Sequence, residues 1–510
     1  MLMDAAQYRD SLRGYAPRVF VEGQAVACVA DEPLLAPGIN GIGVCYDFAH
    51  RPEHAVLMTA RQGTSGKTVN RMTHIDETST DLLYKLEAVR LLCRESGCAQ
   101  RYLVHDAANG LFQATRRADL EHGTDYHARF LNYLHGVQER DLTFAICMTD
   151  AKGDRSKRPG QQANADCYVH ISERRPDGIV IRGTKAIVTG APYVHELMVM
   201  PCRTMVPEDA AFAVCCAVPV DAEGVTIVSR RAGRPGEAAA KFSAKYGQSV
   251  AAVIFDDVFV PWDRVFMAGE TEEAGFLTTS YATHHRHSCI AARAGFGDLL
   301  IGAGALMIEA NGLDPERHGH IRDTMVDLIK IVEGFFACGV AASVYGAKDP
   351  SGNIMPDAVF SNIGKLLLAT QIYDMHRLAH TVSGGLVVAL PGPDEDHNPE
   401  TAASLAAVLG GRPDIPSSQR AEVARFIEDL TVSNQAGWYS VISLHGGGSP
   451  EAMKREIWRN YPVAEKAAVV ERLLDRGLLD EGRRVSKQPG RCCATGCDVP
   501  EPAALPVAAE

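Results

Sequence analysis

The 510-residue chain lacks the features that would place it in a membrane, outside the cell or on nucleic acid. No run of about 18 apolar residues occurs, so the sequence predicts no membrane-spanning segment. The N-terminus, Met1 to Asp4, has no basic stretch followed by an apolar one, as a secretory signal would. Acidic residues outnumber basic ones, 63 to 51, and a net charge of -12 disfavours a partner held by phosphate contacts. We therefore expect a cytoplasmic protein that acts on a small molecule.

The chain also lacks the cysteine spacing of a disulfide-stabilised secreted protein. Its 14 cysteines are scattered, and several, such as Cys147 and Cys215, lie inside hydrophobic runs. We expect reduced thiols, most of them small buried side chains. The exception is the tail, where Cys492, Cys493 and Cys497 lie among prolines. They form either part of a zinc site or an irregular exposed tail, and we assign no metal to them.

The hydrophobic pattern changes twice along the chain. Helical periodicity without proline runs from about residue 78 to 140, and short β-branched runs between turns fill 142 to 270. Helical periodicity then returns at 291–309, 323–345, 362–382 and 420–444. The pattern predicts an α+β protein with a mainly helical domain (1–141), a β-sheet domain (142–272), a helical bundle (273–485) and a Cys/Pro-rich tail (486–510).

The segment Met148 to Ser156 is a polar, glycine-bearing turn that follows an apolar run. It brings backbone N–H groups, the hydroxyl of Thr149, and the cations Lys152 and Arg155 to one place, which suits an anionic or polar cofactor. A solvated turn is the alternative. A second turn, at Gly183 to Ala191, adds the hydroxyl of Thr189 as a further candidate.

Further segments follow in a recognisable order. They are 253–261, 285–288, 295–298, 383–386 and 445–450. In order and register they resemble the flavoprotein family of 4-hydroxyphenylacetate 3-hydroxylases and 4-hydroxybutyryl-CoA dehydratases. The likeness covers about residues 5 to 480 and is nearer to the dehydratase branch.

The resemblance implies an acyl-CoA dehydrogenase-like fold, FAD as cofactor and a homo-oligomer, usually a tetramer. It places Met148, Thr149 and Thr189 along the flavin. Two glycine segments complete the site, partly across a subunit interface, and they contain Gly384, His445, Gly446, Gly447 and Ser449. Glycine lets the backbone approach a planar ligand closely, although 445–450 is also typical of a turn that ends a helix.

Three imidazoles and a guanidinium occupy His284 to His287. On a helix that this row would open, His285, Cys289 and Ala292 share one face at i, i+4 and i+7. So many polar groups are hard to bury without a ligand or partner. A helical histidine is often structural, but this row indicates His285 as a general acid/base.

By the same resemblance, the dehydratase branch binds an iron–sulfur cluster through Cys-x3-Cys and His-x6-Cys. The corresponding positions are Cys98, Tyr102, His285 and Ala292, of which only the first and third could bind iron. The branch's Tyr, Lys and Glu near the site are replaced by Cys289, Arg293 and Ile442. A substitute set of Cys93, Cys98, His285 and Cys289 would need a distorted turn, because residues five apart lie about 140° around a helix.

These features support three hypotheses. The first is a monooxygenase that uses FADH2 from a separate reductase to hydroxylate a phenol or similar molecule. Its candidate substrate contacts are Arg101, Tyr102, His105 and His285. The second is an acyl-CoA dehydratase or isomerase with FAD and with or without a [4Fe-4S] cluster. The third is a non-catalytic flavoprotein. No residue identifies the substrate, since the phenol hydroxylases' own Arg and Tyr are replaced by Leu103 and Ala107.

Overall fold

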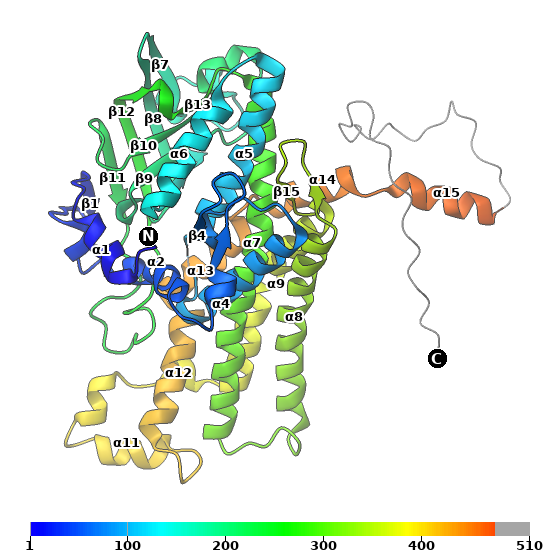
Figure 1. The fold of residues 1–510 in the computed structure, drawn as a ribbon. Coiled ribbons are helices and arrows are strands. Elements are labelled where there is room, and N and C mark those ends of the chain that lie inside the picture. The colour runs from blue at the N-terminus through cyan, green and yellow to red at the C-terminus, as the bar shows by residue number, and fades with distance from the viewer. Residues whose placement is uncertain (1, 99, 475–510) are drawn as a thin grey trace.

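Helices, then a β-sandwich, then a helical bundle follow one another along the chain (Figure 1). The computed structural model describes residues 2–98 and 100–474. This order confirms the α+β prediction. The division into domains at 141 and 272 stays a prediction, because the sheet also takes strands from the first 25 residues.

The N-terminal part supplies the helices that flank the site. They are α1 (Ala5–Leu12), α2 (Ala36–Ala49), α3 (Ala55–Met58), α4 (Ser79–Ser96), α5 (Tyr102–His122) and α6 (Tyr126–Arg140). Helix α4 begins where Thr78 and Asp81 form a capping box and ends at Gly97, whose φ of 71° suits glycine. Two small strands, β3 (Thr59–Arg61) and β4 (Thr68–Asn70), form a hairpin before α4.

Two sheets pack face to face in the middle of the molecule. The larger runs in the order β2-β1-β11-β12-β8-β6, with β7 also paired to β8, and the smaller runs β13-β10-β9-β5. The larger contains β1 (Val19–Val21), β2 (Gln24–Ala25), β6 (Thr149–Asp150), β7 (His170–Arg175), β8 (Gly178–Thr189), β11 (Val225–Ser229) and β12 (Val250–Pro261). The smaller contains β5 (Phe144–Cys147), β9 (Glu196–Val199), β10 (Val214–Pro219) and β13 (Val265–Ala268).

The sandwich has two apolar faces to bury. Alternate residues of β12, such as Val253 and Phe255, meet Cys147 and Val214 of the smaller sheet in one core. The other face of the smaller sheet, with Cys215 and Met198, packs on α5 and α6. The predicted burial of Cys147, Cys215 and Cys216 is confirmed.

The C-terminal bundle is built around α7 (Thr271–Ala310), which packs against α4, α5, α8 (Gly319–Val344) and α9 (Ala358–Ser383). The remaining elements are β14 (Ala347–Lys348), β15 (Ile354–Met355), α10 (Leu386–Ala389), α11 (Ala402–Leu409), α12 (Ser417–Thr431), α13 (Asn434–His445), α14 (Pro450–Asn460) and α15 (Val463–Leu473). Helix α15 projects away from the body of the molecule (Figure 1).

Two helix predictions need correction. The row from His284 to His287 does not open a helix but lies in the middle of α7, which begins at Thr271. The helix expected over 420–444 is broken in two, because the Ser433 hydroxyl accepts the Ala436 N–H at 3.0 Å and caps a new helix, α13.

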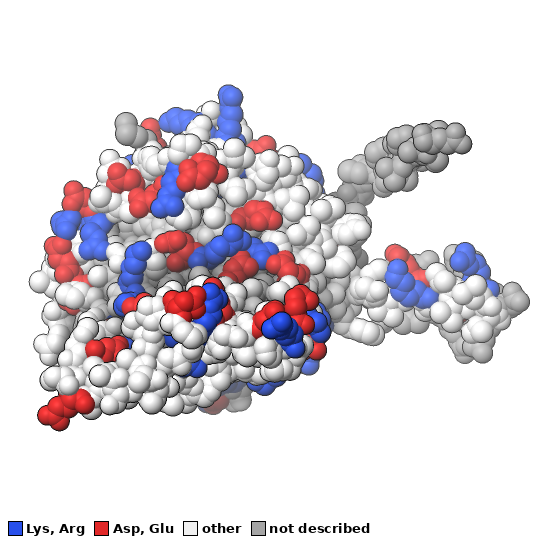
Figure 2. Space-filling model, turned by 90° about the horizontal axis from the view of Figure 1, so that it is seen from below, with Lys and Arg blue, Asp and Glu red and all other residues white. Residues whose placement is uncertain are grey.

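Helix α7 is long and apolar enough to cross a membrane by length and composition alone. Of its most apolar 18-residue window, 61% is buried inside the protein, as in the core helix of a soluble bundle. Acidic and basic side chains are interspersed on the face shown in Figure 2, without a large region of one sign. The tail cysteines lie outside the described residues.

Candidate active site

Thr149 and Thr189, the hydroxyl-bearing residues of the two predicted turns, lie close together on the sheet. Strand β6 pairs with β8 so that Thr149 is opposite Ile187, two residues before Thr189. Because side chains alternate along a strand, these three side chains share one face. Ile187 is 51% exposed there, an apolar surface between two hydroxyls. This surface suits a flat ring with polar edges, since a flavin needs both contacts.

Buried Lys185 holds the first turn in place. Its ammonium lies 2.7 Å from the Asp150 carboxylate and donates to the carbonyls of Met148 at 3.0 Å and Met200 at 2.9 Å. These contacts attach the segment 148–150 to the sheet, so Lys185 acts structurally. Lys152, at a φ of 71°, and exposed Arg155 follow in the loop and remain accessible to an anion.

Residues 100 to 102 connect the sheet to the helices. The Gln100 amide donates to the Thr189 carbonyl at 2.6 Å, and two residues later the ring of Tyr102 stacks 6.1 Å from that of His285. Gly190 allows this approach, because a Cβ there would collide with Gln100. The Thr189 turn and His285 therefore border the same region, although they are almost 100 residues apart in sequence.

His285 is held on both sides of its ring. Nδ1 lies 3.0 Å from the Asp106 carboxylate, Nε2 lies 3.5 Å from the Cys289 sulfur, and the Tyr281 ring stacks at 5.3 Å. Burial alone would lower the pKa of His285, but the Cys289 thiolate and the Asp106 hydrogen bond together raise it to about 10. The imidazole is therefore protonated at neutral pH.

Asp106, on α5, is fully buried but surrounded by donors. The Ser288 hydroxyl donates to it at 2.6 Å, Lys85 Nζ lies 3.8 Å away, and His105 Nδ1 lies 3.7 Å away. Burial acts to raise the pKa of Asp106, but the hydrogen bonds from His105 and His285 lower it below its ordinary range. The carboxylate is thus ionised and fixes the orientation of His285.

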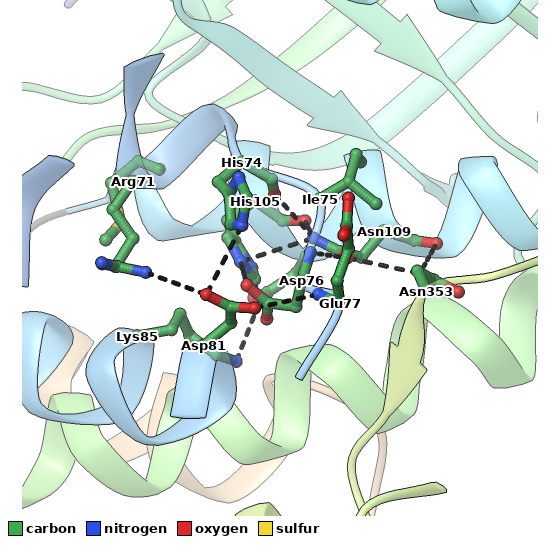
Figure 3. Close-up of polar contacts among 12 residues, drawn as sticks. Arg71, His74, Ile75, Asp76, Glu77, Asp81, Lys85, His105, Asn109 and Asn353 are labelled. Carbon is green, nitrogen blue, oxygen red and sulfur yellow. Dashed lines mark hydrogen bonds and ion pairs between the residues drawn. The ribbon is translucent and has the colours of Figure 1, made fainter. Parts of the chain in front are cut away.

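The network continues away from the pocket through His105 (Figure 3). His105 Nε2 lies 3.0 Å from the Asp76 carboxylate, and the Asn109 side chain accepts the Asp76 N–H at 3.0 Å. The Asn353 amide reaches Asn109 from the loop after β14. His105 is therefore held through Nε2 by Asp76, and its Nδ1 faces the Asp106 carboxylate at 3.7 Å from behind.

Of the two glycine segments, one reaches His285. The Gly447 carbonyl accepts from Arg286 Nε at 2.8 Å, and a Cβ at Gly447 would lie 3.3 Å from His285 Cδ2. The prediction of a helix-ending turn is confirmed: α13 ends at His445, Gly446 caps it, and Ser449 begins α14. The side chains of His445 and Ser449 are exposed.

Gly384 lies elsewhere. It follows α9, and Asn362, 22 residues earlier on that helix, accepts from Arg286 beside His285. At 1.5 Å per residue, Gly384 is about 33 Å from that contact. The structure does not bring it to the His285 pocket of the same chain.

Arg101 also lies apart from the other candidates. Its guanidinium is fully buried, donates to Asp141 Oδ1 at 2.5 Å and stacks 4.0 Å above the Tyr46 ring. It joins α5 to α2 and to the end of α6, on the side opposite Tyr102. A substrate contact by Arg101 stays a prediction without geometric support.

The site does not fit an iron–sulfur cluster. Tyr102 Oη lies 3.8 Å from Cys98 Sγ, and Ala292 has no donor atom. Arg293, 4% exposed, lies close enough to Cys98 to help lower the pKa of that thiol to about 6, after the larger effect of the Cys93 hydrogen bond. Within 2–98 and 100–474, no group of three or more His, Cys, Asp or Glu could hold a metal ion.

Sequence reasoning missed the residues that support His285, namely Asp106, Ser288, Lys85 and Asp76. One signal was available: His105 and Asp106 form a polar pair within a stretch of α5 that is otherwise mostly apolar. A separate cavity of about 540 Å³ lies at the far end of α7 near Ile308 and Arg412. It is about 35 Å along the helix from His285 and is not part of this site.

Family models and individual known proteins match this chain over most of its length. A family model described as 4-hydroxyphenylacetate 3-hydroxylase N terminal matches residues 4–267, and its C-terminal counterpart matches 274–475. The chain therefore belongs to the 4-hydroxyphenylacetate 3-hydroxylase family, as the sequence motifs indicated. It is similar to enzymes of two activities.

The first activity is that of the dehydratase branch. The chain is 35% identical over 482 residues to the 4-hydroxybutyryl-CoA dehydratase/vinylacetyl-CoA-Delta-isomerase of Clostridium aminobutyricum, covering 91% of this chain and 98% of that protein. A solved oxygen-tolerant archaeal 4-hydroxybutyryl-CoA dehydratase from N. maritimus has a TM-score of 0.90 at 35% identity, covering 94% of this chain and 96% of that one.

The second activity is oxygenation. The chain is 23% identical over 496 residues to the oxygenase component of 4-hydroxyphenylacetate 3-monooxygenase from Thermus thermophilus, covering 96% of this chain and 99% of that protein. The crystal structure of such a component with FAD shares the acyl-CoA dehydrogenase-like fold, with a TM-score of 0.81 at 20% identity over 93% and 98% of the two chains. These comparisons support the acyl-CoA alternative better than the hydroxylase that the sequence analysis put first.

Proposed function

We propose that the protein is an FAD-dependent Δ-isomerase of an unsaturated acyl-CoA thioester and that it works without an iron–sulfur cluster. The Clostridium relative is named for both dehydration and Δ-isomerisation. The 3.0 Å contact between His285 Nδ1 and Asp106 carries the proposal. A carboxylate, rather than iron, holds this imidazole, which leaves it free to move protons.

Isomerisation requires fewer chemical steps at the site than dehydration does. Moving a double bond from the β,γ to the α,β position removes one proton at the α-carbon and adds one at the γ-carbon, and nothing is eliminated. The α proton passes to solvent water, and His285 can supply the added proton through Nε2, because Nδ1 faces Asp106. A positioned general acid contributes about 10²- to 10⁴-fold in rate.

The sheet face fits a flavin. The hydroxyls of Thr149 and Thr189 flank the apolar surface of Ile187, and Lys152 and Arg155 lie in the adjoining loop where phosphate oxygens would find cations. FAD bound there would supply redox chemistry and a flat surface against the substrate. Tyr102 and the Gly447 turn would exclude water from the region next to His285.

A homo-oligomer, with a tetramer as the expected form, would explain two features of the chain. Gly384 could border a flavin only in a neighbouring subunit, given its distance from His285. Helix α15, which carries Leu473 at 73% exposure, also projects from the body of the molecule (Figure 1). Light scattering coupled to size-exclusion chromatography measures the oligomeric state, and a monomer that binds FAD would contradict this proposal.

A reduced-flavin monooxygenase is the second candidate. The observation that favours it is Tyr102 and Ala292 at two cluster positions, since the oxygenases need FADH2 from a reductase and no iron–sulfur centre. Dithionite-reduced, FAD-loaded protein mixed with oxygen should then show a flavin hydroperoxide transient and hydroxylate a phenol. Featureless reoxidation with every phenol would count against it.

The deciding experiment uses vinylacetyl-CoA in deuterated water. The FAD-loaded protein should form crotonyl-CoA with deuterium at the γ-carbon, and iron and sulfide analysis of anaerobically purified protein should find no cluster. Recovery of vinylacetyl-CoA without deuterium exchange would refute the isomerase. Stoichiometric iron and sulfide would refute the cluster-free form.

A further inference from the structure

Cys289, His285 and Asp106 lie in line, and the proposed isomerisation uses only the last two. Cys289 is one helical turn after His285 on α7, with its sulfur 3.5 Å from Nε2, while Nδ1 lies 3.0 Å from Asp106 on α5. A nucleophile, a base hydrogen-bonded to it and a carboxylate that orients the base are the parts of a nucleophilic triad.

The carboxylate of this arrangement is firmly held. One Asp106 oxygen faces His285, and the other accepts a hydrogen bond from the Ser288 hydroxyl at 2.6 Å. The Ser288 hydroxyl in turn accepts from the Lys85 ammonium at 2.9 Å. With the Nδ1 proton directed at Asp106, Nε2 is the nitrogen that exchanges a proton with sulfur. The imidazole ring cannot turn without breaking these contacts.

The surroundings favour an ionised thiol. Burial acts to raise the pKa of Cys289, but the His285 imidazolium lowers it below its ordinary value. Lys365, a buried cation on α9, adds to this effect and lies beside the Gly447 turn. Cys289 and His285 are 9% and 7% exposed, so both side chains lie inside the helical junction rather than on the outer surface.

We infer that Cys289 is a nucleophile, activated by His285 and Asp106, that takes the acyl group from a thioester bound in this pocket. The acyl-CoA substrate class rests on the proposed function, but the triad geometry does not.

The step balances as follows. The Cys289 sulfur forms a bond to the thioester carbonyl carbon, the bond from that carbon to the CoA sulfur breaks, and the CoA thiolate takes the proton from His285. In the return step, neutral His285 takes a proton from water, and the hydroxide adds to the acyl carbon. The Cys289 thiolate then leaves, which releases a carboxylic acid and restores the ion pair. The sum is thioester hydrolysis or, if the second step is slow, a stable acyl-enzyme.

Butyryl-CoA tests this inference because it has no double bond to move. Full-length, FAD-loaded protein incubated with it should gain one butyryl group on the peptide that contains Cys289, release one CoA in a burst, and lose the group to neutral hydroxylamine. Cys289→Ala should abolish the adduct. Asp106→Asn should slow its formation at least about tenfold, because the imidazolium that protonates the leaving CoA thiolate is then poorly positioned and less populated.

A matched control is Cys338→Ser, since Cys338 is a half-buried thiol on α8 that donates to the Gly334 carbonyl, and its pKa is raised by burial. This variant should acylate like the unchanged protein. An unmodified Cys289 together with no release of CoA from butyryl-CoA, in protein that isomerises vinylacetyl-CoA, would overturn the inference and leave the isomerase intact.

Alkylation by iodoacetamide distinguishes an inactive triad from a site that does not bind acyl-CoA, because iodoacetamide reacts with a thiolate without any CoA binding. Alkylation should be faster at Cys289 than at the more exposed Cys338, and it should persist below pH 8 because the thiolate is already present. His285→Asn should remove that advantage. If neither CoA ester reacts, fast alkylation of Cys289 supports the triad, and alkylation no faster than at Cys338 overturns it.

Discussion

The sheet face around Thr149 and Thr189 and the helical junction around His285 border one region but are built in opposite ways. On the sheet, half-buried side chains are placed by strand register, and the surface between them is open. At the junction, charged groups from α4, α5 and α7 are buried and paired with one another. The first arrangement suits the binding of a flat cofactor, and the second suits holding a proton in a fixed place.

The two regions also differ in what fills them. The sheet face presents Thr149, Ile187 and Thr189 on an open surface, whereas the interior of the junction is filled by hydrogen bonds to Asp106. Because buried charges are stable only when paired, Asp106 and Lys85 compensate each other there.

The largest expected effect comes from removing the imidazole. His285→Asn should lower the rate of isomerisation by about 10²- to 10⁴-fold, because the general acid is lost. FAD binding, measured by flavin fluorescence, should stay unchanged, because the sheet face is intact. A parallel loss of FAD would mean that the two regions are not separable.

A substitution of Arg101 tests whether this residue belongs to the junction around His285. Arg101→Met leaves the Asp141 carboxylate buried and unpaired, so the free energy of unfolding in urea should fall by about 3 to 5 kcal/mol. The KM for substrate should not change in the protein that remains folded. A raised KM at unchanged stability would instead place Arg101 in substrate binding, as the sequence analysis predicted.

Asp106→Asn should shift the pH profile of isomerisation. The pKa of His285 is raised to about 10, so its proton-donating form is present below that pH and is lost above it. Without the Asp106 charge, the upper limb of the profile should move down by about one to two pH units. Asp374, an exposed carboxylate on α9, provides the control, since Asp374→Asn should leave the limb in place. An upper limb unmoved by Asp106→Asn would show that Asp106 does not set the protonation of His285.

The smallest effect belongs to the sheet. Thr149→Val keeps the shape of the side chain but removes one hydroxyl, and a single neutral hydrogen bond contributes about 1 kcal/mol. The Kd for FAD should therefore rise about fivefold, without a change in the pH profile of isomerisation. An unchanged Kd would remove Thr149 from the flavin site.

Much of the fold could be predicted from the sequence, because hydrophobic periodicity is a local signal. The change from helical to β pattern and back corresponds to α6, β5, β13 and α7. The pattern failed where an element depended on distant partners. Strand β1 pairs with β11 across some 200 residues and with β2 on its other side, and α13 separates from α12 because Ser433 caps it.

The residues of the candidate site likewise divide into those that the local sequence indicates and those that depend on distant partners. Thr149 and Thr189 were singled out because each borders a recognisable turn, although both lie in strands, and Gly447 because a glycine run marks close backbone approach. Asp106, Ser288 and Lys85 were missed because a polar residue inside an apolar helix signals burial without identifying its partner. Arg101 and His105 were grouped with Tyr102 by proximity in sequence, although neighbouring positions on a helix face different directions.

The sequence alone determined the family and the succession of helical and β segments, because these depend on which residues stand in which order. Only the tertiary structure decided which groups surround His285 at the junction. Hydrogen bonds to His285 come from a helix almost 180 residues away in sequence, and a proton's position depends on atoms within about 3 Å, whichever part of the chain supplies them.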